Sequence, residues 1–369
     1  MDILIFILVI IALIVVHEFG HFVAAKWSGM RVDEFGLGYP PRALLLGKIG
    51  ETEYTLNWLP FGGFVKIYGE DTVPLEFGGE GKTSRAFSAR PRYLQAIVLV
   101  AGVTMNLVFA YVLITGALIA GTPRALAPEE VSSAQSAELA VANILPGSPA
   151  ARAGLLPGDS ILSAKDAGGE WSDIDPKSFS AFVAASAGNE VTLKVKRNNT
   201  EQDILATPEA GVAISDPSRY ALGVEVATIG TVPLSFVSAL QEGAGLTWEM
   251  TKLTAKGLWY FFSGVFTLSA DLSQVAGPVG IAGAVGSASM QGWGDLFSIM
   301  AIISINLALI NLIPIPALDG GRLLFVIIES IIRRPIKPSV SQAMNAIGFI
   351  FLILLMLVVT AHDIFKIVG

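Results

Sequence analysis

The sequence has no cysteine, few charged residues and only three histidines. Without cysteine, the chain can form neither a disulfide nor a thiolate zinc site, and its redox compartment cannot be inferred. Charged residues make up 15% of the 369 residues and hydrophobic residues 53%, which excludes an ordinary soluble globule and indicates a membrane protein. The formal net charge is −7, so composition gives no support for nucleic-acid binding.

A long apolar run near the N-terminus carries the most informative motif. Residues 3–25 can cross a bilayer as one helix, at about 1.5 Å per residue against a hydrocarbon core about 30 Å thick. No basic segment precedes the run, and it is longer than the apolar core of a signal peptide. We therefore expect it to be retained.

Within this run, His17, Glu18 and His21 form an HExxH motif. Positions i and i+4 of a helix share a face, so both imidazoles can reach one zinc ion while Glu18 serves as general base. The alternative is a chance match at a frayed helix end, but ionisable groups in a span are costly and usually functional. His362 is a rival ligand, or else a polar residue at a membrane interface.

The segment after the first span is basic and contains Lys26, Arg31, Arg42, Lys48, Lys66, Lys82, Arg85, Arg90 and Arg92. The positive-inside rule places it in the cytoplasm and the N-terminus outside. Residues 53–59 and 63–68 predict strands joined by a turn at 60–63. This β-hairpin could lie against the membrane or dip into it, and its edge could pair with an extended substrate. The candidate substrate-binding residues there are Phe61, Gly62 and Gly63, although an ordinary surface hairpin is the alternative.

Residues 93–120 predict a second span, in which Gly102 permits close helix packing and Asn106 needs a polar partner. Asn106 is a candidate substrate-binding residue, with helix packing as the alternative. Residues 121–233 are richer in charged and turn-forming residues and predict a soluble domain, including a strand at 193–196. Residues 141–161 resemble a bacterial PDZ domain, with a strand, a PGSPA turn, a short helix and a G-D-x-I strand entry.

The C-terminal part mixes amphipathic and broken apolar segments. Residues 234–266 predict an amphipathic helix at the outer membrane interface, and 276–286 a glycine-rich loop. A third apolar region, 296–332, is interrupted by prolines and glycines, as membrane helices are near functional sites. Asp319 is its only acidic residue before position 326, and a lone buried carboxylate needs a cation or a partner. A final span is expected at 344–361.

The motifs occur in a characteristic order, namely HEFGH, the PDZ-like segment, GPVGI and NLIPIPALDGG. In this the chain resembles, over essentially its whole length, the site-2 protease family of intramembrane zinc metalloproteases, in particular its bacterial RseP-like (regulator of sigma-E protease) branch. The resemblance implies that His17, His21 and Asp319 bind Zn2+, that Glu18 is the catalytic base and that Asn311 handles substrate. Some members carry two PDZ domains, whereas this chain has room for one.

The expected fold is a polytopic α-helical membrane protein with about four transmembrane helices, a membrane-associated β-hairpin and one extracytoplasmic α+β PDZ domain. Residues 1–120 and 291–369 are expected to form the two halves of the protease core. Residues 121–233 are expected to form the PDZ domain, and 234–290 an interfacial region with a glycine-rich loop.

The expected function is regulated intramembrane proteolysis of single-pass membrane proteins, which in the family are often trimmed anti-sigma factors or remnant signal peptides. The expected location is the bacterial inner (plasma) membrane, in contact with the lipid bilayer, with the active site towards the cytoplasmic side. Two other functions are alternatives. A catalytically inactive PDZ-bearing scaffold is disfavoured by the intact Glu18, and a zinc transporter would need polar groups across the whole membrane depth.

Overall fold

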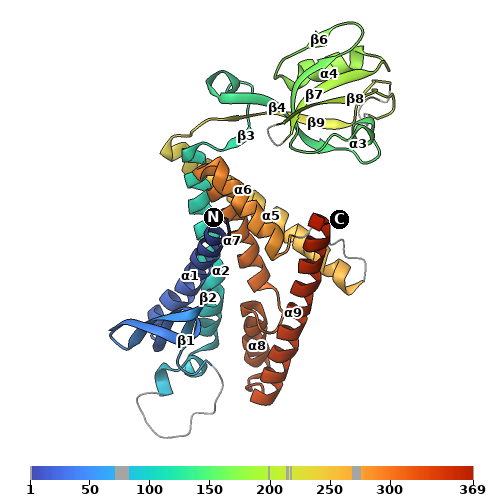
Figure 1. Cartoon of the computed structure of the whole chain (residues 1–369). Helices are drawn as coiled ribbons and strands as arrows, with labels where there is room; N and C mark the ends of the chain where they lie inside the picture. The colour runs from blue at the N-terminus through green and yellow to red at the C-terminus, as the bar shows by residue number, and fades with distance from the viewer. Residues whose placement is uncertain are drawn as a thin grey trace. The chain divides into compact units, whose positions relative to one another are not determined.

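Figure 1 shows the structure as a computed structural model, which describes residues 2–70, 83–197, 200–212, 216, 218–267 and 276–368. The chain divides into two compact units. One combines Met1–Ala120 with Ser235–Gly369 and contains most of the helices, and the other is Gly121–Leu234 and contains the larger sheet. The two units are described separately.

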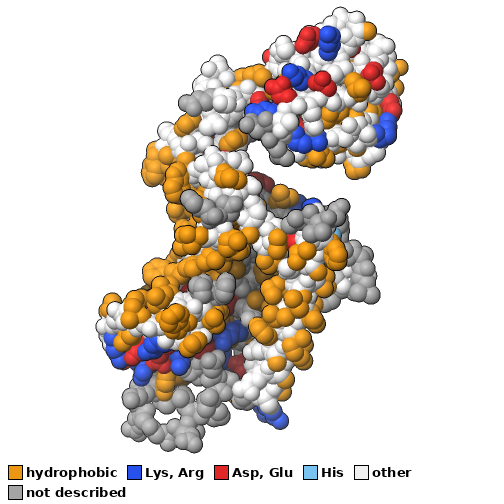
Figure 2. Space-filling model, viewed as in Figure 1, with side chains coloured by type: hydrophobic (Ala, Val, Ile, Leu, Met, Phe, Trp, Pro, Cys, Tyr) orange, Lys and Arg blue, Asp and Glu red, His pale blue; other side chains and the backbone are white. Residues whose placement is uncertain are grey.

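Four described helices of the first unit are long and apolar enough to cross a membrane, by length and composition. They are α1 (Asp2–Trp27), α2 (Arg92–Ala120), α7 (Trp293–Leu312) and α9 (Pro338–Val368). This confirms the expected number of candidate spans. The hydrophobic side chains on the visible surface of this unit in Figure 2 are what a lipid-facing helix requires.

Helix α2 is the central element of the helical unit, and it packs against α1, α7, α8 (Asp319–Ile332) and α5 (Phe236–Phe266). In Figure 1, α1 in dark blue and α2 in teal run side by side. The amphipathic helix expected at 234–266 is confirmed as the helix α5, which exposes the aromatic side chains of Trp248, Trp259 and Tyr260.

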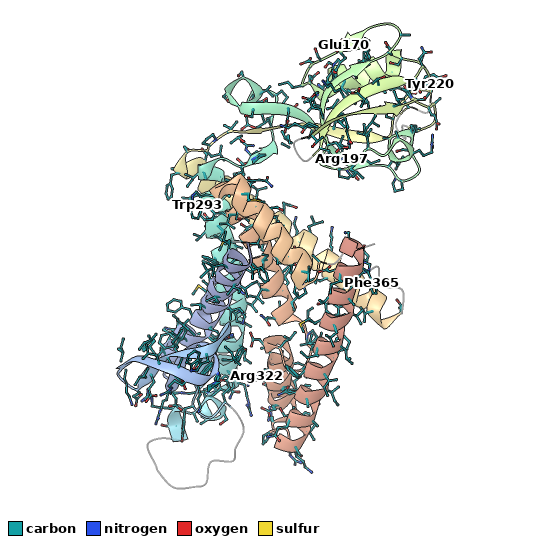
Figure 3. The ribbon with its side chains drawn as sticks, viewed as in Figure 1. Glu170, Arg197, Tyr220, Trp293, Arg322 and Phe365 are labelled. Carbon is teal, nitrogen blue, oxygen red and sulfur yellow. The ribbon has the colours of Figure 1, made fainter. Side chains whose placement is uncertain are left out.

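The apolar region 296–332 is interrupted as predicted, between the end of α7 at Leu312 and the start of α8 at Asp319. Two ion pairs anchor α8 to other elements. Arg92 of α2 lies 2.7 Å from Glu329, and Arg322, which is labelled in Figure 3, pairs with Glu70 after the second strand. These two ion pairs hold α8 within a unit whose helices otherwise pack through apolar contacts.

The prediction of a glycine-rich loop over 276–286 is wrong, because α6 (Pro278–Gln291) is a helix. Asp363 of α9 accepts hydrogen bonds from the backbone N–H groups of Gly277 and Gly280, at 3.2 and 2.8 Å. It thereby satisfies donors that the start of a helix leaves unpaired. The small residues that argued against a helix instead let α6 pack closely against α1 and α7.

The predicted β-hairpin is present, but its predicted turn is wrong. Strand β2 (Thr52–Ile67) runs unbroken through 60–63 and pairs with β1 (Val32–Ile49). The chain reverses instead at Gly50, whose φ of +61° is in the left-handed region that glycine adopts readily. Sequence pattern missed β1 because apolar and polar residues do not alternate in its second half.

The two strands fold over each other, since Leu37 has both Leu56 and Gly63 as pairing partners. The first part of β1 therefore lies between the two halves of β2. The pair of strands, called the β ribbon below, exposes many large apolar side chains to its surroundings: Tyr39, Leu44, Leu45, Leu46, Ile49, Leu56, Trp58 and Leu59. Charged side chains follow one edge of the same ribbon (Figure 2).

The second unit contains, among its described residues, a seven-stranded sheet in the order β3-β9-β4-β5-β7-β8, with β6 paired to β5. The strands are β3 (Pro123–Ala125), β4 (Gln135–Ile144), β5 (Ser160–Lys165), β6 (Glu170–Trp171), β7 (Val191–Arg197), β8 (Thr200–Ala206) and β9 (Val224–Thr231). Strand β7 confirms the strand expected at 193–196.

Two helices accompany this sheet, α3 (Pro149–Ala153) and α4 (Pro176–Ala185). The Ser148 side chain caps α3 by accepting the Ala151 N–H, and Gly154 ends the helix in the left-handed conformation. The expected order of strand, turn, short helix and strand is therefore present. Apolar side chains of the strands and of both helices form one continuous core.

Asp159 is the buried polar anchor of this unit. Its carboxylate accepts hydrogen bonds from the Arg197 guanidinium at 2.6 and 2.7 Å and from the Leu156 N–H at 2.9 Å. Burial alone would raise the pKa of this carboxyl, but these contacts outweigh burial and lower it. The pair joins the entry of β5 to the end of β7, where Arg197 is labelled in Figure 3.

We expect Asp159→Asn to destabilise this unit by about 2 kcal/mol, since it removes a charge-assisted bond from a buried acceptor. Because the pKa of Asp159 is lower in the folded protein, its contribution is fully present above about pH 4 and is lost as pH falls through the folded pKa. Amide hydrogen exchange of β5 and β7 in the full-length protein measures both effects.

The matched control is Glu201→Gln, which removes the exposed ion pair between Glu201 and Lys194 on the same sheet. Exposed pairs contribute little, so exchange should hardly change. Equal exchange in the Asp159 variant and the wild type would contradict the role assigned to Asp159.

Candidate metal centre

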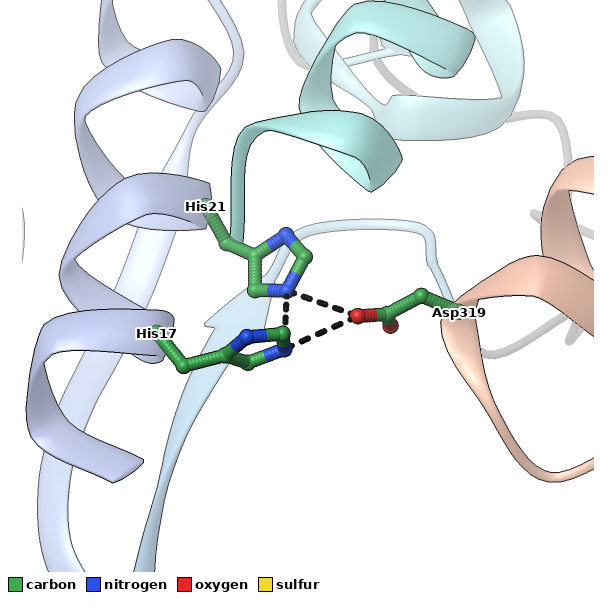
Figure 4. A group of neighbouring side chains, drawn as sticks. All are labelled: His17, His21 and Asp319. Carbon is green, nitrogen blue, oxygen red and sulfur yellow. Dashed lines mark hydrogen bonds and ion pairs between the residues drawn. The ribbon is translucent and has the colours of Figure 1, made fainter. Parts of the chain in front are cut away.

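Three side chains that can bind a metal meet between α1 and α8 (Figure 4). His17 Nε2 lies 2.9 Å and His21 Nε2 3.2 Å from Asp319 Oδ2, and the two imidazole nitrogens are 3.1 Å apart. Asp319 is 302 residues from His17 in the sequence. In the described part of the chain, this is the one cluster of three histidine or acidic side chains with ligand spacing.

The two histidines share a face of α1 because they are four residues apart. Both are buried, at 6 and 8% exposure. Glycines let α2 pass directly over this face: a Cβ at Gly20 would lie 2.5 Å from the Ala101 carbonyl oxygen, and a Cβ at Gly102 would lie 2.4 Å from His21 Nε2. A side chain at either glycine would displace the helices or the imidazoles, so the close contact depends on both.

Helix α2 also contacts the far side of each imidazole. His21 Nδ1–H donates to the backbone carbonyl of Val98 at 2.8 Å, and the Asn106 carboxamide lies 3.2 Å from His17 Nδ1. A ligand histidine whose second nitrogen is held in this way has a fixed ring orientation. The Val98 bond further leaves the His21 Nε2 lone pair directed at the cluster.

Asp319 is brought to the cluster by the break between α7 and α8, where it is the first residue of α8. The two positions after Asp319 are glycines, and neither has room for a side chain. A Cβ at Gly320 would lie 2.3 Å from the Leu312 carbonyl oxygen, and a Cβ at Gly321 would lie 2.3 Å from that of Ile315. The chain can therefore turn tightly back on the end of α7 only with glycine at both positions.

Helix α9 packs against the same turn between α7 and α8. The Ala317 N–H donates to Asn345 Oδ1 at 3.3 Å, and Ala317 adopts a left-handed φ of +80°. Gly348 lies against the Pro316 carbonyl, since a Cβ there would be 2.0 Å from the oxygen. This arrangement fixes the backbone two residues before Asp319.

The donor set fits a zinc ion. Nitrogen and oxygen ligands that hold a tetrahedral zinc at about 2.0–2.1 Å lie about 3.3 Å from one another. The observed separations of 2.9 to 3.2 Å are close to this value. Three protein ligands leave one position open, as in catalytic zinc sites. Asp319 is the least buried of the three, with a side chain 19% exposed, so the cluster is not sealed.

The side chain of Glu18, on α1, lies next to the β ribbon. A Cβ at Gly63 would lie 3.6 Å from Glu18 Cγ. Strand β2 therefore borders the carboxylate that the HExxH motif assigns as general base.

The remaining predicted residues are placed as follows. Gly62 packs under the Tyr39 ring, where a Cβ would lie 2.8 Å from it, and the side chain of Phe61 lies outside the described part of the structure. Among described residues, no hydrogen bond joins Asn311 to the three clustered side chains. His362 lies on α9 and does not belong to the cluster.

The Val98 carbonyl could not be predicted as a partner of His21, because a main-chain acceptor leaves no signature in the side chain. A spacing signal was nevertheless available. Val98, Gly102 and Asn106 are four residues apart in α2 and so share one helical face, which is the face that covers both imidazoles.

Known proteins that are similar to this chain carry peptidase or protease names. The sequence profile of peptidase family M50 matches residues 5–355. A protein of Clostridium perfringens, named as a candidate zinc metalloprotease, is 36% identical over 354 residues, covering 96% of this chain and 95% of its own. One from Nostoc with the same description is 33% identical over 362 residues, covering 96 and 93%. The regulator of sigma-W protease RasP of Bacillus subtilis is 30% identical over 438 residues, covering 97% of each chain.

Replacing Asp319 by Ala should lower zinc affinity by more than about tenfold, because even changes behind the ligands cost about 10–100-fold. Metal analysis of purified protein, with a competing chelator, measures the loss. His362→Ala is the control and should retain zinc, since His362 is outside the cluster. Full zinc occupancy in the Asp319 variant, or loss of zinc on changing His362, would contradict this ligand set.

Proposed function

Since the chain belongs to peptidase family M50, whose relatives are named zinc metalloproteases, we propose that this metallopeptidase cleaves the membrane-spanning segments of other proteins. The observation that carries the proposal is the cluster of His17, His21 and Asp319 beside Glu18, on a helix long enough to cross a membrane. Hydrolysis at this depth would be intramembrane proteolysis.

The chain's own residues have distinct tasks in this reaction. His17, His21 and Asp319 would hold the zinc ion, which would supply polarisation of the scissile carbonyl and activation of the attacking water. Glu18 takes the proton from that water and passes it to the leaving amine. Asn311, at the end of α7, is proposed to donate a hydrogen bond to the substrate backbone or the developing oxyanion.

The β ribbon is proposed to hold the substrate extended. A helical membrane segment hides its peptide bonds, so it must unwind before cleavage. Gly63 is adjacent to Glu18, and strand pairing near Phe61, Gly62 and Gly63 would bring an extended chain to the general base.

The substrates are proposed to be single-pass membrane proteins, such as trimmed anti-sigma factors or remnant signal peptides. A relative named regulator of sigma-W protease supports the first class. Cleavage inside a membrane suits such substrates, since their spanning segments are accessible laterally. Comparing membrane-protein fragments that accumulate with and without active enzyme would identify them.

Residues 121–233 are proposed to be a PDZ domain, between core halves at 1–120 and 291–369. The order of β4, turn, α3 and β5 supports this. So does a groove of about 740 Å3 beside α4, lined by apolar residues such as Phe179, Val183 and Leu222. A groove between a helix and a strand suits an extended peptide.

The proposed orientation places the β ribbon and α8 on the cytoplasmic side of the inner membrane, and the N-terminus and residues 121–233 outside the cytoplasm. Basic residues on the ribbon and after α8 support it, including Arg42, Lys48, Arg333 and Arg334. The exposed leucines of the ribbon suit contact with the cytoplasmic face of the bilayer.

Glu18→Gln should abolish cleavage of a membrane-spanning substrate, by at least about 100-fold, while zinc stays bound. The amide cannot take a proton, but all three ligands remain. Turnover is measured in detergent or liposomes and zinc by metal analysis. Substantial residual turnover would remove Glu18 from its role. Failure of the wild type to cleave any membrane-spanning substrate would favour a scaffold, and zinc flux in liposomes would favour a transporter.

The natural absence of cysteine makes the orientation testable by single-cysteine labelling. We expect a membrane-impermeant maleimide added to spheroplasts to label Glu201→Cys on β8 but to spare Lys48→Cys on the ribbon, because only β8 lies outside the cytoplasm. Both side chains are about half exposed. Both variants should react after the membrane is dissolved. The reverse pattern in spheroplasts would invert the orientation.

A further inference from the structure

Asn106 is a fully buried polar residue next to the metal cluster. It is 0% exposed on α2, and Ser304 of α7 donates a hydrogen bond to its backbone oxygen at 2.8 Å. Its Nδ2 lies 3.2 Å from His17 Nδ1, whereas its Oδ1 has no hydrogen-bond partner among the described residues. A buried amide with one end unpaired requires an explanation.

The requirements of His17 decide which end of the amide faces the imidazole. To bind a cation through Nε2, a neutral imidazole must carry its proton on Nδ1. A protonated Nδ1 is a donor and cannot pair with the NH2 end of an amide, so the acceptor Oδ1 must face it instead. The oxygen and nitrogen of an amide are distinguished only by their hydrogen bonds. Turning the Asn106 carboxamide breaks no other bond, since Nδ2 contacts only His17 and Oδ1 has no partner; the NH2 group then takes the unpaired position.

We propose that Asn106 is a positioning residue for His17. Its side-chain oxygen accepts a hydrogen bond from the His17 Nδ1–H group, and this keeps the Nε2 lone pair directed at the metal. The inference rests on the proposed zinc site. The neighbouring ligand supports it, because the Val98 carbonyl does the same for His21 Nδ1–H. One face of α2 therefore orients both imidazoles, and complete burial of Asn106 places it behind the metal rather than on a surface that substrate contacts.

The test measures zinc affinity of the full-length protein in detergent, by competition with a chelator. Asn106→Leu and the smaller Asn106→Ala remove the acceptor and should weaken zinc binding by about 10–100-fold. Asn106→Asp supplies a carboxylate acceptor in the same place and should retain affinity within a few-fold of the wild type. Thermal unfolding without zinc identifies any variant that fails to fold, and the alanine variant serves if the leucine variant does.

Thr115→Val is the matched control, because it removes another buried polar group from α2 whose hydroxyl also lacks a partner. It should leave zinc affinity unchanged. Turnover provides a second measurement: at saturating zinc the Asn106→Ala variant should keep the KM of the wild type, since the residue does not touch substrate.

Three results would overturn the inference. They are unchanged zinc affinity in both Asn106→Leu and Asn106→Ala, equal losses in Asn106→Asp and Asn106→Ala, or a raised KM with normal zinc affinity. The first indicates no role in metal binding, the second a donor rather than an acceptor, and the third a substrate contact. His17→Ala in the same assay separates these from failure of the proposed function, because normal zinc affinity in that variant would remove the site itself.

Discussion

Two imidazole nitrogens and a carboxylate oxygen, all within 3.2 Å of one another in a mostly buried site, need a cation between them. The geometry of the helical unit follows from this requirement. Helix α1 can present both histidines to α2 only because positions 20 and 102 are glycine. The chain can bring Asp319 back to the end of α7 only because positions 320 and 321 are glycine. The glycines of the two motifs are thus consequences of the distance between the ligands.

Helix α2 supplies none of the three candidate ligands, yet it contacts both imidazoles. It contacts four other helices of the unit, and its Val98, Gly102 and Asn106 face the imidazoles. Metal sites are commonly tuned by such outer contacts. A rigid, central helix is well suited to this task, because its backbone hydrogen bonds fix the positions of groups four residues apart.

Much of this arrangement was predictable from sequence because it depends on local periodicity. The i, i+4 spacing of His17 and His21 and the length of the apolar runs are local properties. The unpaired Asp319 at a helix break could be linked to them by chemistry alone. The errors arose where a distant partner decides the structure. Helix α6 depends on Asp363, which follows Gly280 by 83 residues, and the ribbon depends on the pairing of β1 with β2 rather than on its own pattern. The contact of Asn106 with His17 likewise joins residues 89 apart.

The separation of 302 residues between His17 and Asp319 has a consequence for biosynthesis. A ribosome has made most of the chain before Asp319 exists, so the nascent protein carries His17, Glu18 and His21 without the third side chain of the proposed metal centre. If the proposed site is the active one, the growing polypeptide could not hydrolyse neighbouring membrane proteins or its own later segments during insertion. The order of the three side chains along the chain would then delay activity until α8 has been added.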